Sequence, residues 1–362
     1  MKRGSPSETV RYRELAMGLA ALTAAGSAYA QSSVTLYGIV DSGVAYTTNA
    51  GKSGGQNQSA AQMITGGDAA DRFGLTGVED LGGGMSAVFT LENGFSLASG
   101  TLQQNGRLFG RQAFVGLQTP YGKLTLGRQR VPIYDYFSIL DPLAYYNWSL
   151  SAQDSQYINR ADNSVKYTAS VGPLDFDVLY STGYDATIEN GGQVPGQFRV
   201  GQEVSAGTSY TSGRLRATVV YDLRRGTSVG TQSNKEQRVA AGLSYQLLDA
   251  LKLFAGYKWF NSSIPATAAH SNMYYGGLQY KVSPAFFISA ATYYTDITSA
   301  DQHPIYFGIN TAYLLSKRTT IYAEVGYVRN NNGSDLGLAG FGTGVVPGAN
   351  QTGVAVGINH RF

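Results

Sequence analysis

The sequence predicts an all-β fold, a 16-stranded antiparallel transmembrane β-barrel with a long inward-folded constriction loop. Three observations predict it. From Val34 onward, segments of roughly ten residues alternate apolar with polar or small side chains, which is typical of outer-membrane barrel strands. The connections alternate between short and long, as periplasmic turns and external loops do. After the N-terminal segment, no run approaches the roughly 18 consecutive apolar residues that a spanning helix needs.

The N-terminal segment has the composition of an export signal. Basic residues precede a short apolar run over 16–25, and Ala28-Tyr29-Ala30 offers a small-residue cleavage site. We therefore expect residues 1–30 to be a cleaved signal peptide and residues 31–362 to form the outer-membrane barrel. The 362-residue chain has no cysteine, so it is not a disulfide-stapled secreted domain. Its net charge of +3 is too small to indicate a nucleic-acid partner.

Alternating segments recur along the whole chain, with turn signals between them. We expect strands, in chain order, at about 34–46, 72–77, from 85 onward, 109–119, 123–127, 163–170, 173–182, 202–211, 214–224, 237–247, 250–260, 273–282, 285–296, 304–315, 318–329 and 352–362. The residues between the first two strands are rich in Gly, Ser, Gln and Asn, and we expect a loop there. An even strand count with both termini at the short-turn end allows the sheet to close without a free edge.

The two faces of the predicted strands have opposite character. In the ninth strand, Leu215, Val219 and Tyr221 share one parity, while Arg214 and Arg216 share the other. A membrane barrel directs its apolar face to lipid and its polar face to the lumen. We therefore expect four basic side chains on the lumen wall: Arg214, Arg216, Lys252 and Lys258.

The segment around 129–160 is far longer than an ordinary connection, and it is aromatic rather than polar. Its apolar content argues against disorder. A barrel of this size encloses an aqueous channel, so we expect this loop to fold into the lumen and narrow it. Asp135 and Asp141 would present carboxylates to the pore.

Basic side chains on the wall would face those carboxylates. The candidates on this basic side are Arg72, Arg111, Arg160 and Lys166. Opposed charges at a constriction set ion selectivity; alternatively, these side chains merely pair with the loop carboxylates. Charges of inward parity lean basic over the whole chain, which predicts a weak to moderate anion preference.

Five segments carry a family resemblance: SSVTLYGIVDSGVAY, DRFGLTGVEDLGGGMSAVFTLENGF, GRQAFVGLQTPYGKLTLGRQ, NRADNSVKYTAS and the terminal GINHRF. Together they resemble the trimeric Gram-negative general porins, specifically the beta-proteobacterial branch. The loop sequence PIYDYFSILDP departs from the PEFGG-type sequence of the enterobacterial branch.

The resemblance implies a homotrimer in the outer membrane, in contact with lipid and lipopolysaccharide, that passes small hydrophilic solutes and anions. It implies that Arg72, Arg111 and Arg160 match the constriction arginines of the family, and that the barrel-assembly machinery recognises Phe362. Arg128 is a candidate for the subunit contact.

No signal for catalysis stands out. His270, His303 and His360 are far apart and have no metal-ligand spacing. Without cysteine or a Ser/His/Asp grouping, nucleophilic catalysis has no candidate residues. We therefore expect no enzymatic activity and no cofactor. The alternatives to a general pore are a substrate-preferring outer-membrane channel, a barrel enzyme and an exported adhesin.

Overall fold

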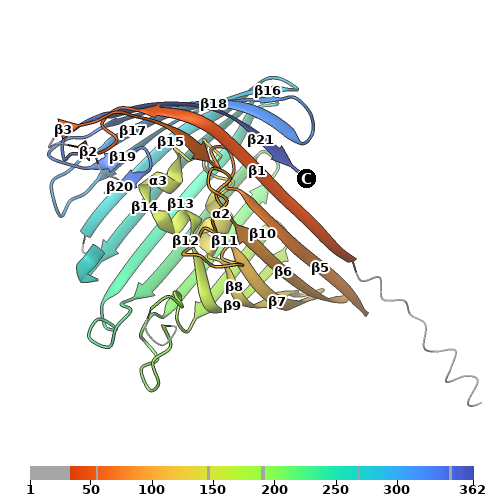
Figure 1. Ribbon diagram of the computed structural model, residues 1–362. Helices are drawn as coiled ribbons and strands as arrows, with labels where there is room; N and C mark the ends of the chain where they lie inside the picture. The colour runs from red at the N-terminus through yellow and green to blue at the C-terminus, as the bar shows by residue number, and fades with distance from the viewer. Residues whose placement is uncertain (1–32, 54–55, 145–146, 189–191, 268, 342–344) are drawn as a thin grey trace, which may run out of the picture.

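The computed structural model describes residues 33–53, 56–144, 147–188, 192–267, 269–341 and 345–362. The predicted signal peptide, 1–30, lies outside the described residues. The chain forms a closed antiparallel barrel (Figure 1). β1 (Ser33–Thr47) closes it by pairing with β21 (Gln351–Arg361), with Asp41 opposite Asn359. Within the described residues, no helix is both long and apolar enough to cross a membrane.

The barrel sheet contains 17 strands, of which β4 (Ala60–Thr65) and β5 both pair with β1 and share one position in the wall. The wall therefore has sixteen positions, and each predicted strand overlaps one of them. The remaining wall strands are β5 (Arg72–Gly82), β6 (Met85–Gly94), β7 (Gln112–Thr119), β8 (Gly122–Arg130), β9 (Arg160–Val171), β10 (Leu174–Ser181), β11 (Glu203–Ser212), β12 (Leu215–Arg225), β13 (Lys235–Leu248), β14 (Leu251–Ser262), β15 (Ala269–Ser283), β16 (Phe286–Asp296), β17 (Ile305–Leu314) and β18 (Thr319–Arg329).

The expected loop between the first two strands contains β4, so that part of the prediction is wrong. Val44 of β1 lies opposite Met63 of β4, whereas Leu36 lies opposite Leu75 of β5. Between the two half-strands, residues 66–71 turn inward. The Asp41 carboxylate accepts backbone N–H bonds from three of them, at 2.9–3.1 Å. The surrounding Gly, Ser, Gln and Asn masked the short alternating stretch in the sequence.

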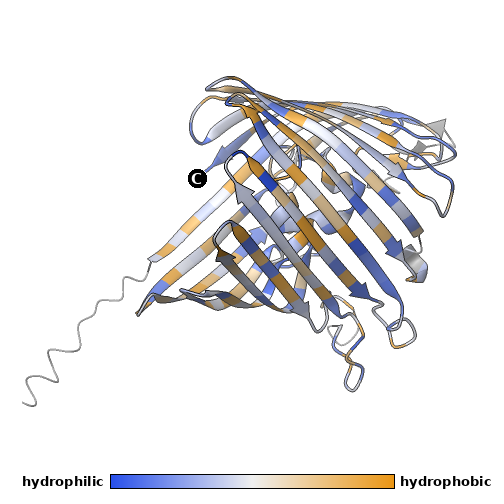
Figure 2. Cartoon of the chain, turned by 180° about the vertical axis from the view of Figure 1, so that it is seen from behind, coloured by the Kyte–Doolittle hydropathy of each residue, from blue (hydrophilic) through white to orange (hydrophobic). Residues whose placement is uncertain are grey.

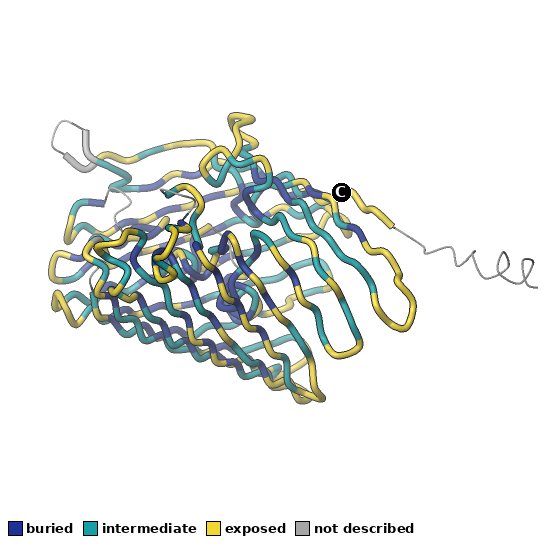
Figure 3. Tube along the Cα trace, turned by 90° about the horizontal axis from the view of Figure 1, so that it is seen from below, coloured by how far each residue is buried: buried dark blue, intermediate teal, exposed yellow. Residues whose placement is uncertain are grey.

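The barrel is apolar outside and polar inside, as the alternation predicts. On β12, Val219 and Tyr221 are exposed, whereas Thr218 and Asp222 are buried. Hydropathy and burial both alternate along the strands (Figures 2 and 3). The outward apolar side chains face the membrane, and the inward polar groups face the lumen.

Smaller elements sit in the loops at the long-loop end and inside the barrel. Two short hairpins, β2/β3 (Lys52–Ser53 and Gln56–Asn57) and β19/β20 (Leu336–Gly337 and Gly340–Phe341), and the turn η3 (Pro265–Thr267) belong to the long loops. The connection between β8 and β9 holds α2 (Pro132–Phe137), α3 (Leu150–Gln153) and η1 (Ser155–Ile158). We refer to this connection, residues 131–159, as the inner loop.

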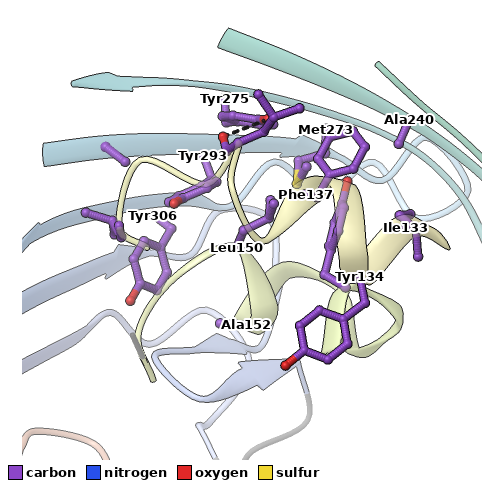
Figure 4. Packing of buried hydrophobic residues seen from close by; sticks show 14 of the residues in the cluster. Ile133, Tyr134, Phe137, Leu150, Ala152, Ala240, Met273, Tyr275, Tyr293 and Tyr306 are labelled. Carbon is purple, nitrogen blue, oxygen red and sulfur yellow. Dashed lines mark hydrogen bonds between the residues drawn. The ribbon is translucent and has the colours of Figure 1, made fainter. Parts of the chain in front are cut away.

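The inner loop forms a hydrophobic core within the barrel. Ile133, Phe137 and Leu150 are fully buried, and they pack among wall tyrosines that include Tyr293 and Tyr306 (Figure 4). A core in this place orders the loop, because its apolar side chains leave water only when they lie against the wall.

Candidate functional site

The inner loop crosses the interior along the wall from β10 to β21. Wall side chains hold it through its backbone carbonyls. The Tyr275 hydroxyl donates to Leu140 O at 3.2 Å, and the Gln279 amide donates to Pro142 O at 2.9 Å. At its far end, Asn147 N donates to Gly67 O at 2.9 Å, which joins the loop to segment 66–71. The expected location of the loop, inside the barrel, is thus the observed one.

Glycines on the inner wall let the loop approach closely. A Cβ atom added at Gly277 would lie 2.5 Å from Pro142 Cβ, and one at Gly308 would lie 2.5 Å from Leu143 Cδ1. Both are shorter than a van der Waals contact. The glycines of this kind, whose added Cβ would meet an inner-loop side chain, are Gly207, Gly242, Gly277, Gly308, Gly326 and Gly353. Inward-facing glycines along β11–β21 therefore mark, in the sequence, the part of the wall against which the loop packs.

A buried ion-pair cluster anchors the returning arm of the loop. The Asp154 carboxylate accepts from Arg238 Nε and from Lys258 Nζ, each at 2.7 Å. Burial opposes the charge on this carboxylate, but the two cations hold the pKa of Asp154 well below its usual range. Next to it, Gln156 donates to Glu203 at 2.7 Å. Lys258, a predicted lumen-wall residue, therefore lies on the inward face but beneath the loop.

Basic side chains gather on the wall from β5 to β9, where the loop leaves cavities between itself and the wall. Arg72 of β5, Arg111 just before β7 and Arg160 of β9 line one cavity of about 450 Å³. Across it lie the loop side chains of Tyr134, Ala144, Asn147, Ser151 and Ile158. The structure thus brings three predicted constriction arginines together, with the inner loop facing them.

Arg130 was not predicted, and it extends this cluster. Its guanidinium lies 4.8 Å from the centre of the Tyr134 ring, and that of Arg160 lies 5.2 Å from the same ring. Burial alone would raise the pKa of the Tyr134 phenol, but the positive charges of Arg130, Arg160, Arg111 and Arg72 outweigh it and hold that pKa below its ordinary value. A register shift interrupts the β8–β9 pairing between Gly127 and Gln129, so strict alternation does not place Arg130 at the end of β8.

Two of these four arginines have an ion-pair partner. Arg111 pairs with Glu92 at 2.7 Å, and Arg130 lies 3.9 Å from the Asp135 carboxylate. In the part of the chain that the structure describes, Arg72 and Arg160 form no ion pair, and their Nε atoms have no hydrogen-bond partner. We name Arg72, Arg111, Arg130 and Arg160 the arginine wall. Among the side chains described along this cavity, Asp68 of segment 66–71 is the only carboxylate.

The predicted acidic side lies elsewhere. Asp141 is 1% exposed, accepts from the Tyr293 hydroxyl at 2.5 Å and from Leu150 N at 3.2 Å, and does not line the pore. The expectation that Asp141 faces the channel is therefore wrong, because its carboxylate holds the loop turn together instead. Asp135 pairs with Lys166, which also binds Asp177 at 3.0 Å. These residues line a neighbouring cavity of about 600 Å³ that reaches the short turn at Pro120.

The other predicted wall residues have different surroundings. Arg216 lines the cavity near the short turns, and the Lys252 ammonium lies 4.9 Å from the Phe254 ring centre. Arg214 was expected on the lumen wall, but it precedes the first residue of β12. It is exposed at the rim, where it pairs with Asp249 at 3.1 Å.

Two further predicted residues lie at the chain end and behind the inner loop. Phe362 exchanges two backbone hydrogen bonds of 3.1 Å with Gly38. These bonds lie at the end of the barrel where β1 begins and β21 ends. Arg128 pairs with Asp162 at 2.7 Å, so its charge is used within the subunit. His270 and His360 are exposed and His303 is half-buried, and the described residues contain no group of three or more His, Asp or Glu side chains placed to hold a metal.

A closed barrel with a lipid-facing apolar exterior and a polar lumen narrowed by an inner loop defines a membrane channel. The chain belongs to the Gram-negative porin family, whose model matches residues 18–333.

Relatives of known name match nearly the whole chain. An outer membrane porin protein of Bordetella pertussis is 32% identical over 93% of this chain and 96% of its own length. Outer membrane porin protein 32 of Delftia acidovorans is 31% identical over 96% and 99%. The structure of an anion-selective porin from Comamonas acidovorans superimposes with a TM-score of 0.77 at 28% identity, over 92% of this chain and 100% of that one. The chain is therefore an outer-membrane porin of the beta-proteobacterial branch, a water-filled channel for passive diffusion.

Proposed function

We propose that this porin prefers anions and that the arginine wall produces the preference. The supporting observation is that Arg72 and Arg160 form no ion pair among the described residues and that the loop side chains across their cavity carry no carboxylate. Of the loop carboxylates, Asp141 and Asp154 are engaged elsewhere, and Asp135 pairs with Lys166 and reaches only Arg130 of the arginine wall, at 3.9 Å. An anion that enters the constriction therefore meets an uncompensated positive potential, which cations must also cross. The similarity to a porin described as anion-selective agrees with this proposal.

The remaining partners follow from the same assignment. Solutes pass by diffusion with no chemistry and no cofactor. Subunits associate as a homotrimer surrounded by outer-membrane lipid and lipopolysaccharide, residues 1–30 direct export, and Phe362 is recognised by the barrel-assembly machinery. Migration of the unheated protein at three times the mass of the heated chain tests the trimer.

Reversal potentials in planar bilayers under a KCl gradient test the anion preference. The wild-type channel should favour chloride, and the double variant Arg72→Gln/Arg160→Gln should lose much of that preference. Each charge removed is worth on the order of 1 kcal/mol of attraction, or about fivefold in relative permeability. Arg214→Gln is the matched control, because that arginine is paired at the rim. Clear cation selectivity of the wild-type channel would overturn the proposal.

A further inference from the structure

The inner loop exposes an apolar side chain to the water-filled lumen, directly beside the arginine wall. Ile158 is 42% exposed and lines the arginine cavity. Its carbonyl accepts from Arg160 Nη1 at 2.8 Å, so the same residue positions a guanidinium and presents an apolar surface next to it. Exposed isoleucine on the barrel exterior contacts lipid, but in the lumen it has only water or solute to contact.

A second cavity continues this apolar surface toward the long loops. It has a volume of about 340 Å³ and shares Asn147, Ser151 and Ile158 with the arginine cavity. Ile64, Trp148 and Leu338 contribute to its lining, together with the uncharged amides of Gln62 and Gln351. No charged side chain lies among its described lining residues. A solute from the long-loop end therefore passes an uncharged, partly apolar cavity before it reaches the arginines.

We infer that the constriction favours monocarboxylates that carry a compact aromatic ring, with benzoate as the simplest example. The carboxylate would take its hydrogen bonds from the guanidinium groups of Arg72, Arg111 and Arg160, which line the cavity. The ring would cover Ile158 and stack on a guanidinium plane, as the Tyr134 ring already does with Arg130 and Arg160. This inference rests on the proposed anion preference and names the class of anion.

The same geometry disfavours dicarboxylates. Opposite the arginines, a second carboxylate would meet the uncharged side chains of Tyr134, Ala144, Asn147, Ser151 and Ile158 or the carboxylate of Asp68. None of these carries a positive charge to compensate a second negative one, and desolvating a carboxylate against an apolar side chain is costly. Selection should also be confined to this level of the channel. The cavity near the short turns mixes Asp135, Asp175 and Asp177 with Lys123 and Lys166, although it too exposes an isoleucine, Ile139.

Single channels in planar bilayers test the inference, with sodium benzoate, acetate and succinate as probes. Wild-type channels should pass benzoate better than acetate, although acetate is the smaller anion and would pass faster if size alone decided. Benzoate should also reduce the chloride current more than succinate does. Ile158→Ser should remove the benzoate advantage by at least a few-fold. Ile139→Ser is the matched control and should retain it. Heat-modifiable migration establishes that each variant is folded.

The outcomes separate this inference from the anion preference itself. Ile158→Ser retains every arginine, so its chloride-over-potassium ratio should equal that of the wild type. Equal permeability of benzoate and acetate in the wild type, or a benzoate advantage that survives Ile158→Ser, overturns the ring-carboxylate selection. A wild-type channel without chloride preference overturns the proposed function instead.

Discussion

Two pairs of basic wall residues have the same inward parity but opposite environments. One pair is Arg238 and Lys258, and the other, on the opposite side of the lumen, is Arg72 and Arg160. The first two lie beneath the inner loop and share the Asp154 carboxylate. The second two face the channel and form no ion pair among the described residues. Counting basic side chains on the lumen face therefore does not give the field of the pore. The field depends on which charges the loop covers and neutralises.

The covering loop divides the barrel interior into two halves. Along β11–β21, wall glycines such as Gly277 and tyrosines such as Tyr275 receive the loop. Along β5–β9, the wall stays open and basic. Arg111 and Arg160 are only 3% and 7% exposed there, and Glu92 pairs with Arg111. The cavity beside them, of about 450 Å³, is large enough to admit water that would solvate the remaining guanidinium charge.

The largest change in channel properties should follow from deleting part of the inner loop, which divides the barrel interior. Deleting Tyr134 to Leu143 removes α2 and the loop segment that crosses β11–β17, so the lumen widens. Single-channel conductance should rise several-fold and the anion preference should weaken, while the barrel remains folded. An unchanged conductance in a folded variant would mean that the inner loop is not the constriction.

A smaller change should follow from pushing the loop away from the wall. Gly277→Val places a side chain against Pro142 of the loop and against the backbone oxygen of Ala290 on β16, each 2.5 Å from the added Cβ, so the loop must shift into the channel and the wall must adjust beside it. Conductance should fall or fluctuate. Gly276→Val, one residue earlier and on the outer face, is the control, since the nearest atom to an added Cβ there is Phe254 O at 3.8 Å. Equal effects of the two variants would argue against close loop packing at Gly277.

Substitutions of two carboxylates, Asp154 and Asp249, compare a buried ion pair with an exposed one. Asp154→Asn leaves Arg238 and Lys258 without their shared anion, and breaking such a buried pair costs about 3 kcal/mol or more. The loop arm should loosen, and open-channel current noise should increase. Asp249→Asn breaks only the exposed pair with Arg214, which is worth about 1 kcal/mol at most, and should leave the recordings unchanged. Identical noise in both variants would mean that Asp154 does not anchor the loop.

The smallest effect on conductance is expected from lowering the pH. Because the folded-state pKa of Asp154 is depressed, its stabilisation is fully present above the unfolded value of about 4. It is lost only as pH falls through the lower folded value. Wild-type conductance measured from pH 7 down to about 4.5 should therefore show no step from release of this arm. A sharp transition within that window that is absent in Asp154→Asn would contradict this assignment.

By itself, the sequence determined the barrel, its strands and the presence of a loop in the lumen. Period-two alternation is a local property, and an aromatic segment of this length fits no other place in a barrel. Arg72, Arg111 and Arg160 also follow from the sequence, through parity and resemblance. The tertiary structure alone decided that Asp141 is buried, that Asp135 pairs with Lys166, and that Arg130 lies against the Tyr134 ring of the inner loop. These outcomes depend on the path of the loop across distant strands, and the pairing of charges across that distance leaves no local pattern in the chain.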